Sequence, residues 1–106
     1  MKTIVIQIHQ DPRSKRIARF VNTLISLPEI KKLRIDKGPT SQRYVNIGIP
    51  TKRVRKTWRE LRGKIRSDRI LSKNSIVVCE GKHGWNDYEL IYHWDVDVID
   101  KKWRTA

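Results

Sequence analysis

Cysteine is almost absent from this sequence: Cys79 is the only one, and it lies in the apolar run Ile76–Cys79. A single cysteine can form neither an internal disulfide nor a zinc cluster. We therefore expect Cys79 to be a small buried hydrophobe in a reducing, cytoplasmic setting. His9, His83 and His93 are too widely separated for any metal-binding motif. The sequence thus predicts no metal and no cofactor.

Long apolar runs are also missing. No stretch approaches the roughly 18 consecutive apolar residues of a membrane span, and the first ten residues alternate apolar and polar side chains, unlike a signal peptide. The sequence contains neither a glycine-rich phosphate loop nor a nucleophile elbow. We expect a single cytoplasmic domain over residues 1–106, with no membrane as its partner.

Acidic residues are few. The chain has 24 Lys and Arg against 11 Asp and Glu, for a formal net charge of +13. Residues 1–74 hold 20 of these cations and only 5 of the acids, whereas residues 75–106 hold 4 cations and 6 acids. A charge of this size is typical of proteins that bind nucleic acid or an anionic membrane surface, and of these two partners we expect nucleic acid. The contrast between the two parts predicts two different binding surfaces.

The most basic stretch, residues 49–69, has the periodicity of one amphipathic helix. Apolar side chains recur at helical spacing, at Val54, Trp58, Leu61 and Ile65. Thr51, which follows Pro50, suits the N-cap. The other surface carries one acid, Glu60, and the cations Lys52, Arg53, Arg55, Lys56, Arg59, Arg62, Lys64 and Arg66. Because neighbouring like charges repel, we expect a polyanion to offset this repulsion. The candidate nucleic-acid contacts in this stretch are Lys52, Arg53, Arg55, Lys56, Arg59 and Arg62.

A second basic helix is predicted after the first strand, Thr3–Ile8, in which Ile4, Ile6 and Ile8 alternate with other side chains. Asp11 and Pro12 suit its N-cap and first position. It should run to about Ser26 with a stripe of apolar residues, Ile17, Phe20, Val21, Leu24 and Ile25. Its first turns hold four candidate phosphate contacts, Arg13, Lys15, Arg16 and Arg19.

The remaining pattern predicts strands at Leu33–Asp36, Arg43–Ile49, Ile76–Cys79 and Tyr88–Trp94, with a loop at 37–42, a polar linker at 67–75 and a turn at 81–87. The predicted order is strand, helix, strand pair, helix, strand, strand. Two helices on one face of a mainly antiparallel sheet define an α+β, ferredoxin-like sandwich with an extra C-terminal strand.

Two patterns leave other functions open. Asp11 is the one acid near the end of the first strand and could hold Mg²⁺ in a nuclease, although a helix cap is its simpler role. A stripe of alternating apolar residues could stack bases, as in an RNA-binding accessory protein, or form a core face or a dimer seam. This stripe comprises Tyr88, Leu90, Tyr92 and Trp94.

The end of the chain is the least basic part. Residues 95–106 are too few to fold alone, so we expect them to add to a sheet edge or to bind a partner. The candidate partner-binding residues are Val96, Val98, Ile99 and Trp103. Asp95, Asp97 and Asp100 would repel DNA and attract a basic protein.

The order of elements resembles the small CRISPR adaptation protein, CRISPR-associated protein two, in its type I-E form. In that form a Pro-Arg-x-Arg-x-Arg turn opens the first helix, and residues 12–18 here read PRSKRIA. The later strand and second helix of the family resemble residues 44–48, YVNIG, and 53–58, RVRKTW. Its final strand is similar to residues 94–99, WDVDVI. The segment at 27–42 is longer here than that form needs.

The resemblance implies a homodimer whose basic surfaces hold the middle of a DNA duplex while integrase dimers bind the duplex ends. Its role would be structural, and the integrase subunit would perform the chemistry. The residues themselves predict backbone contact without sequence preference. We therefore expect a non-catalytic scaffold for double-stranded DNA, with a nuclease using Asp11 or an RNA-binding protein as the alternatives.

Overall fold

The structure is a computed structural model that describes residues 1–38, 43–97, 102 and 103. Within these residues the chain forms five strands and three helices. In chain order they are β1 (Lys2–Ile8), α1 (Lys15–Ile25), β2 (Arg34–Lys37), β3 (Val45–Thr51), α2 (Val54–Arg66), α3 (Arg69–Ser72), β4 (Ser75–Gly81) and β5 (Gly84–His93).

The five strands form one antiparallel sheet in the order β2-β3-β1-β4-β5. The register pairs buried residues of one strand with buried residues of the next. Ile4 of β1, for example, pairs with Ile49 of β3 on one side and Cys79 of β4 on the other. Because side chains alternate along each strand, this register puts every buried residue of the three central strands on one face. The predicted α+β class and antiparallel sheet are confirmed.

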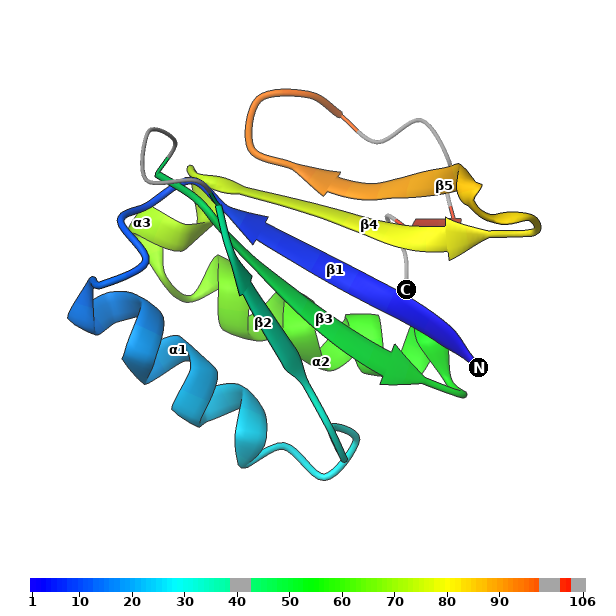
Figure 1. Cartoon of the computed structure of the whole chain (residues 1–106), viewed down its shortest axis with the longest axis horizontal. Coiled ribbons are helices and arrows are strands. Elements are labelled where there is room, and N and C mark those ends of the chain that lie inside the picture. The colour runs from blue at the N-terminus through cyan, green and yellow to red at the C-terminus, as the bar shows by residue number, and fades with distance from the viewer. Residues whose placement is uncertain (39–42, 98–101, 104–106) are drawn as a thin grey trace.

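Both long helices cover that face, and the opposite face of the sheet is left without helices (Figure 1). The core between the layers is made of the alternating residues of the strands and the helical stripes. Trp58, Leu61 and Ile65 of α2 are fully buried there, as the stripe predicted. None of the helices over residues 1–38, 43–97 and 102–103 is long and apolar enough to cross a membrane.

The start of α1 differs from the prediction. Ser14, not Asp11, is the N-cap, and its hydroxyl accepts a hydrogen bond from the backbone N–H of Arg16 at 3.1 Å. Asp11 instead closes a tight turn before the helix. Its carboxylate accepts from the backbone N–H of Arg13 at 2.9 Å, and its carbonyl accepts from that of Ser14 at 2.9 Å. Both residue types favour caps and turns, so local sequence alone left the choice open.

The start of α2 also lies later than predicted. Thr51 is the last residue of β3 and Arg53 is the N-cap, with no hydrogen bond from its side chain. The Thr51 hydroxyl accepts from the backbone N–H of Arg53 at 3.0 Å and lies 2.8 Å from the hydroxyl of Thr57. Thr51 and Thr57 are both buried, so this pair of hydroxyls ties the end of β3 to the first turn of α2.

The predicted linker at 67–75 contains a short helix, α3. Asp68 is its N-cap, and its carboxylate accepts hydrogen bonds from the backbone N–H groups of Ile70 and Leu71 at 3.0 and 3.1 Å. Leu71 is the buried residue that attaches α3 to the core. The Ser75 hydroxyl then donates to the Leu71 carbonyl at 2.6 Å, which joins α3 to β4. Because a single buried residue in a polar segment gives no helical periodicity, this helix could not be predicted from the sequence.

The hairpin of β4 and β5 is longer than predicted and is irregular. Val77 pairs with Tyr92 and Val78 with Leu90, so β5 has one extra residue, Ile91, at this point. Such a bulge rotates the strand. Tyr92 therefore packs on the helical side, where its hydroxyl donates to the Ser72 carbonyl at 2.6 Å. The predicted single stripe with Tyr92 and Leu90 on one face is wrong.

Trp103, near the end of the chain, is part of the core. This residue is only 6% exposed. Its carbonyl accepts from the indole N–H of Trp58 at 3.3 Å, and its own indole N–H donates to Glu89 at 3.0 Å. The structure thus uses Trp103 inside its own chain and not on a partner-facing surface, a correction to the prediction. Val96 is exposed, whereas Val98 and Ile99 lie outside the described residues.

Candidate nucleic-acid interface

Five cations surround one surface hollow where β1 and α2 begin. We call them the α2-start cluster: Lys2, Lys52, Arg53, Arg55 and Lys56. The hollow measures about 580 Å³, and its other lining residues are Met1, Thr51 and Val54. The lining contains no acid, and all five cations are exposed. Cations held this close together and open to solvent form the footprint that an anionic polymer needs.

The backbone at this point also favours an anion. The N-cap of α2, Arg53, makes no side-chain hydrogen bond to the helix, and the first turn holds no acidic residue. The N–H groups of a first helical turn have no partner within the helix, and the helix dipole adds partial positive charge there. Lys56 Nζ forms an ion pair with Glu29, which lies outside α2, at 3.0 Å. The hydrogen bond from Lys56 lowers the pKa of the Glu29 carboxyl.

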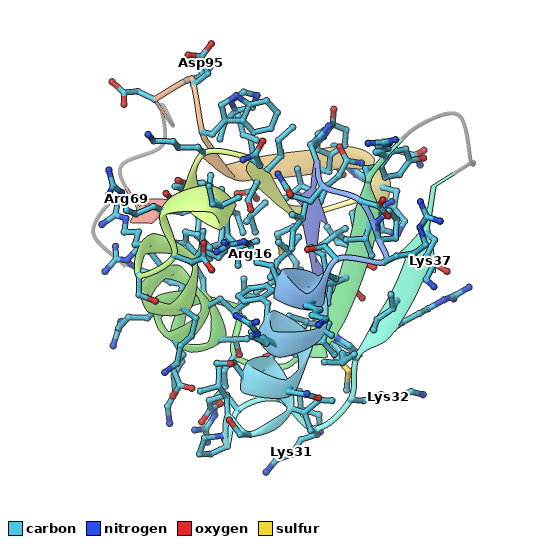
Figure 2. All side chains as sticks on the ribbon, turned by 90° about the vertical axis from the view of Figure 1, so that its left-hand side faces the viewer. Arg16, Lys31, Lys32, Lys37, Arg69 and Asp95 are labelled. Carbon is cyan, nitrogen blue, oxygen red and sulfur yellow. The ribbon has the colours of Figure 1, made fainter. Side chains whose placement is uncertain are left out.

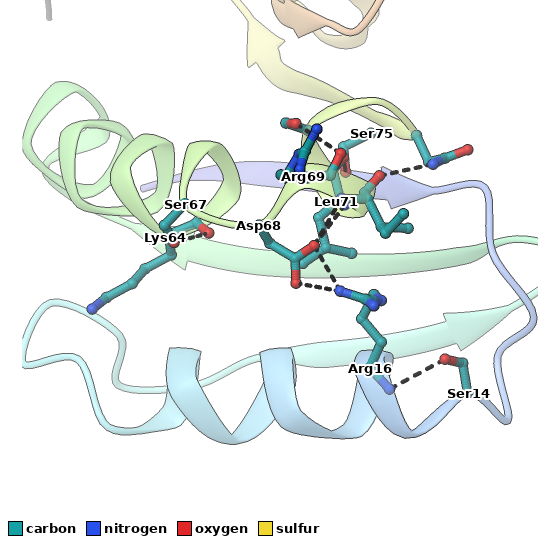
Figure 3. A network of polar contacts seen from close by, with 11 residues as sticks. Ser14, Arg16, Lys64, Ser67, Asp68, Arg69, Leu71 and Ser75 are labelled. Carbon is teal, nitrogen blue, oxygen red and sulfur yellow. Dashed lines mark hydrogen bonds and ion pairs between the residues drawn. The ribbon is translucent and has the colours of Figure 1, made fainter.

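A second, smaller hollow of about 190 Å³ lies between α1 and α2. Its charged lining residues are Arg16, Arg19, Lys64 and Asp68. Figures 2 and 3 show Arg16 of α1 reaching across toward the segment that joins α2 to α3. There one guanidinium nitrogen lies 2.9 and 3.0 Å from the two carboxylate oxygens of Asp68. Arg16 thus joins the helices, and only Arg19 and Lys64 are left at this hollow for an outside anion.

The ionisation of Asp68 is controlled by opposing effects. Burial raises its pKa, but the hydrogen bonds from the Leu71 and Ile70 N–H groups and from Arg16 outweigh burial and lower it below the usual value. The carboxylate is therefore ionised at neutral pH and is shared between a helix cap and an ion pair.

Asp11, the candidate nuclease ligand, is paired with its neighbour. Its carboxylate accepts from the side chain of Arg13 at two positions, each 3.2 Å, and the side-chain hydrogen bond from Arg13 lowers its pKa. Among residues 1–38, 43–97 and 102–103, no group of three His, Cys, Asp or Glu side chains could hold a metal ion. The nuclease remains a prediction that nothing in this geometry favours.

The other predicted phosphate contacts are spread over the helical layer. Lys15 and Arg59 are exposed, Arg19 lines the hollow between α1 and α2, and Arg62 is half-buried. The structure therefore gathers four of the ten predicted contacts, Lys52, Arg53, Arg55 and Lys56, in one cluster. Three of the ten form ion pairs with carboxylates of the same chain: Arg13 with Asp11, Arg16 with Asp68 and, inside the cluster, Lys56 with Glu29.

Sequence reasoning missed Lys2 as a member of this interface. Lys2 pairs with Thr51 across the β1–β3 ladder, which brings it beside the start of α2. Nearly 50 residues separate the two positions in the chain, and their meeting depends on strand register. Lys64 was seen as part of the basic helix but was not assigned to a site, because the α1–α2 hollow exists only once the helices pack.

Comparison with protein-family models, with curated proteins and with solved structures gives no match to this chain. The resemblance to the CRISPR adaptation protein therefore stays a prediction.

Proposed function

We propose that this protein binds the phosphate backbone of nucleic acid, with duplex DNA as the favoured form, and that the α2-start cluster is the main contact surface. The observation that supports the proposal is the set of five exposed cations around an acid-free hollow. Backbone phosphates are the ligands that such a surface recognises, and they contain no sequence information. The protein would therefore bind without sequence preference.

The proposal predicts a steep dependence of affinity on salt. Each phosphate neutralised contributes a slope of about −0.9 to log K against log salt. If the five cations each meet one phosphate, the slope is about −4.5, and affinity should fall about 500-fold between 50 and 200 mM salt. A filter-binding titration with a duplex of about 20 base pairs measures this slope. A slope flatter than about −1 would overturn the proposal.

A triple variant tests whether the α2-start cluster is the contact surface. Lys52→Ala, Arg53→Ala and Arg55→Ala together remove three exposed cations from the cluster, so the slope should flatten by about three units. The matched control is the triple variant Lys31→Ala, Lys32→Ala and Lys37→Ala, which removes the same charge from the segment between α1 and β2 and from β2 itself (Figure 2).

The control should change the slope by less than about one unit, because its lysines lie outside the cluster. Equal effects of the two triple variants would show that binding depends on net charge alone and not on this surface. Stronger binding to vesicles of anionic lipid than to DNA would also contradict the proposal.

We further propose that the fold is ferredoxin-like. Two features support it: the element order β1-α1-β2-β3-α2-β4 and the strand order β2-β3-β1-β4, with β5 added beyond β4. This fold is the one that the CRISPR resemblance implies. The narrower role, a homodimeric scaffold in a spacer integrase, predicts a dimer in sedimentation equilibrium and co-purification with an integrase subunit. A monomer that binds DNA but no integrase would exclude it.

A further inference from the structure

The sheet face without helices has a hollow of about 640 Å³, which lies over β1, β3, β4 and β5. Its floor is apolar, made of Val5, Ile76, Val78 and Leu90. Two aromatic side chains of β5 border it, Trp85 and Tyr88, which are 50% and 60% exposed. Ligand sites in proteins usually have volumes of about 300–1,000 Å³ and apolar walls with a few polar groups. The hollow has the size and the lining of such a site.

Two polar side chains that line this hollow, Asn46 and His93, have N–H groups that can donate hydrogen bonds to a ligand. The Gln7 side-chain amide donates to the Asn46 carbonyl oxygen at 3.0 Å. No described residue accepts from the Asn46 amide N–H groups. His93 Nδ1 accepts from the backbone N–H of Asp95 at 3.0 Å, so in the neutral ring Nε2 carries the proton and is a donor. Asn46 and His93 both line the hollow.

Exposed aromatic rings beside free donors match the chemistry of a nucleobase. Every base has a flat face that stacks on an aromatic side chain, and its edge has acceptors, which are ring nitrogens and, in every base except adenine, carbonyl oxygens. Only unpaired bases expose both, because in a duplex the faces are stacked and the edges are paired. The ligand that fits is therefore a single strand and not a duplex.

The net charge favours a nucleic acid over a second copy of this chain on the same face. A second copy on this face would have to offset the repulsion between two chains of formal charge +13. A single strand adds negative charge at every nucleotide and is attracted instead. We propose that the open sheet face binds unpaired bases of single-stranded nucleic acid, with Trp85 and Tyr88 as stacking residues and Asn46 and His93 as donors to the base edge. This site goes beyond the proposed duplex surface and does not depend on the α2-start cluster.

The test compares two single-stranded probes of ten nucleotides, one with bases and one with abasic sugars in every position, so that the phosphates are the same. The variant is Trp85→Ala with Tyr88→Ala. Removing an aromatic ring removes the stacking contact with one base. The affinity of the variant for the probe with bases should therefore fall by about 5-fold or more. Its affinity for the abasic probe and for a duplex of 20 base pairs should not change.

Two controls accompany this variant. Ile25→Ala removes an exposed apolar side chain of α1, 58% exposed and outside the hollow, and should leave all three affinities unchanged. Trp85→Phe with Tyr88→Phe keeps both rings and should retain most of the affinity for the probe with bases. Thermal unfolding of each variant confirms that these exposed substitutions leave the fold intact.

Three outcomes would overturn the inference. The first is an equal loss for the abasic probe, which would show that the aromatic residues act only through the phosphates. The second is no loss for either probe. The third is a wild-type dimer in sedimentation equilibrium that the Ala variant converts to a monomer, which would make this face a contact between copies. Loss of duplex binding in the α2-start variant, with single-strand binding retained, would separate the two sites.

Discussion

Replacing Asp68 should separate the two functions of its carboxylate. Asp68 caps α3 through the N–H groups of Ile70 and Leu71, and it forms an ion pair with Arg16 of α1 at 2.9 Å. Asp68→Asn keeps a side-chain oxygen that can cap the helix but removes the charge. Asp68→Ala removes both, so the two variants together separate the cap from the ion pair.

The expected magnitudes follow from the exposure of the pair. A lost Asp cap costs about 1 kcal/mol. The Arg16 and Asp68 side chains are 42% and 26% exposed, and an ion pair that is partly open to solvent contributes about 0.5–1 kcal/mol. Asp68→Asn should therefore lower the free energy of unfolding by about 0.5–1 kcal/mol, and Asp68→Ala by about 1.5–2 kcal/mol. For a chain of this size the larger loss lowers Tm by roughly 6–12 °C.

The assay is urea unfolding at pH 7, followed by tryptophan fluorescence, for the wild type, both Asp68 variants, Arg16→Ala and the double variant of Arg16→Ala with Asp68→Ala. The double-mutant cycle isolates the coupling between the two side chains. The pH dependence supplies an independent check. The folded-state pKa of Asp68 lies below its usual value of 3.8, so the stability difference between wild type and Asp68→Asn should be constant above about pH 5. It should disappear as the pH falls through the folded-state pKa.

Two results would refute this reasoning. If Asp68→Asn destabilised the protein as much as Asp68→Ala, capping of α3 would contribute nothing. If the cycle gave a coupling energy indistinguishable from zero, the contact between Arg16 and Asp68 would not stabilise the fold, and Arg16 would again be available as a phosphate contact.

Three further predictions concern the core and the β4–β5 hairpin. Trp103→Ala should lower the free energy of unfolding by about 3–5 kcal/mol in urea, because the indole is buried and bonded to Glu89; a loss below about 1 kcal/mol would show that this residue is no part of the core. Gly81→Ala should cost at least about 1–3 kcal/mol in the same assay, since an added Cβ would clash with the carbonyl oxygen of Asp87; wild-type stability would contradict the close approach. Burial raises the pKa of the Cys79 thiol to about 11, so at pH 8 a thiol reagent should label it only as fast as the protein opens; immediate labelling would refute its burial.

Most of the secondary structure could be predicted because it depends on local period. Alternation at Ile4, Ile6 and Ile8 defines a strand with one buried face, and the spacing of Trp58, Leu61 and Ile65 defines a helical stripe. The structure buries all six residues. The element boundaries were harder to predict: Asp11 was expected to cap α1, but Ser14, which is an equally good cap residue, does so instead.

The candidate sites were harder to predict than the elements. The basic character of α2 was plain from composition, but Lys2 joins the α2-start cluster only through the register of β1 with β3. The aromatic stripe on β5 was predicted from simple alternation. One extra residue, Ile91, turns Tyr92 to the core and leaves Tyr88 and Leu90 on the open face. A bulge of this kind cannot be recognised from the apolar pattern of one strand, because it is defined by the pairing of that strand with its neighbour.

The sequence by itself determined the charge of this protein, the period of its main elements and their order along the chain, since each of these is a property of residues close together. Only the tertiary structure decided which cations are free to bind an anion. Arg16 and Asp68 are 52 residues apart, yet they meet because α1 and α2 pack on the same face of the sheet. Trp58 and Trp103 are 45 residues apart and share one buried contact. Charge and apolarity are set residue by residue, but pairing and burial depend on the distances that the fold creates.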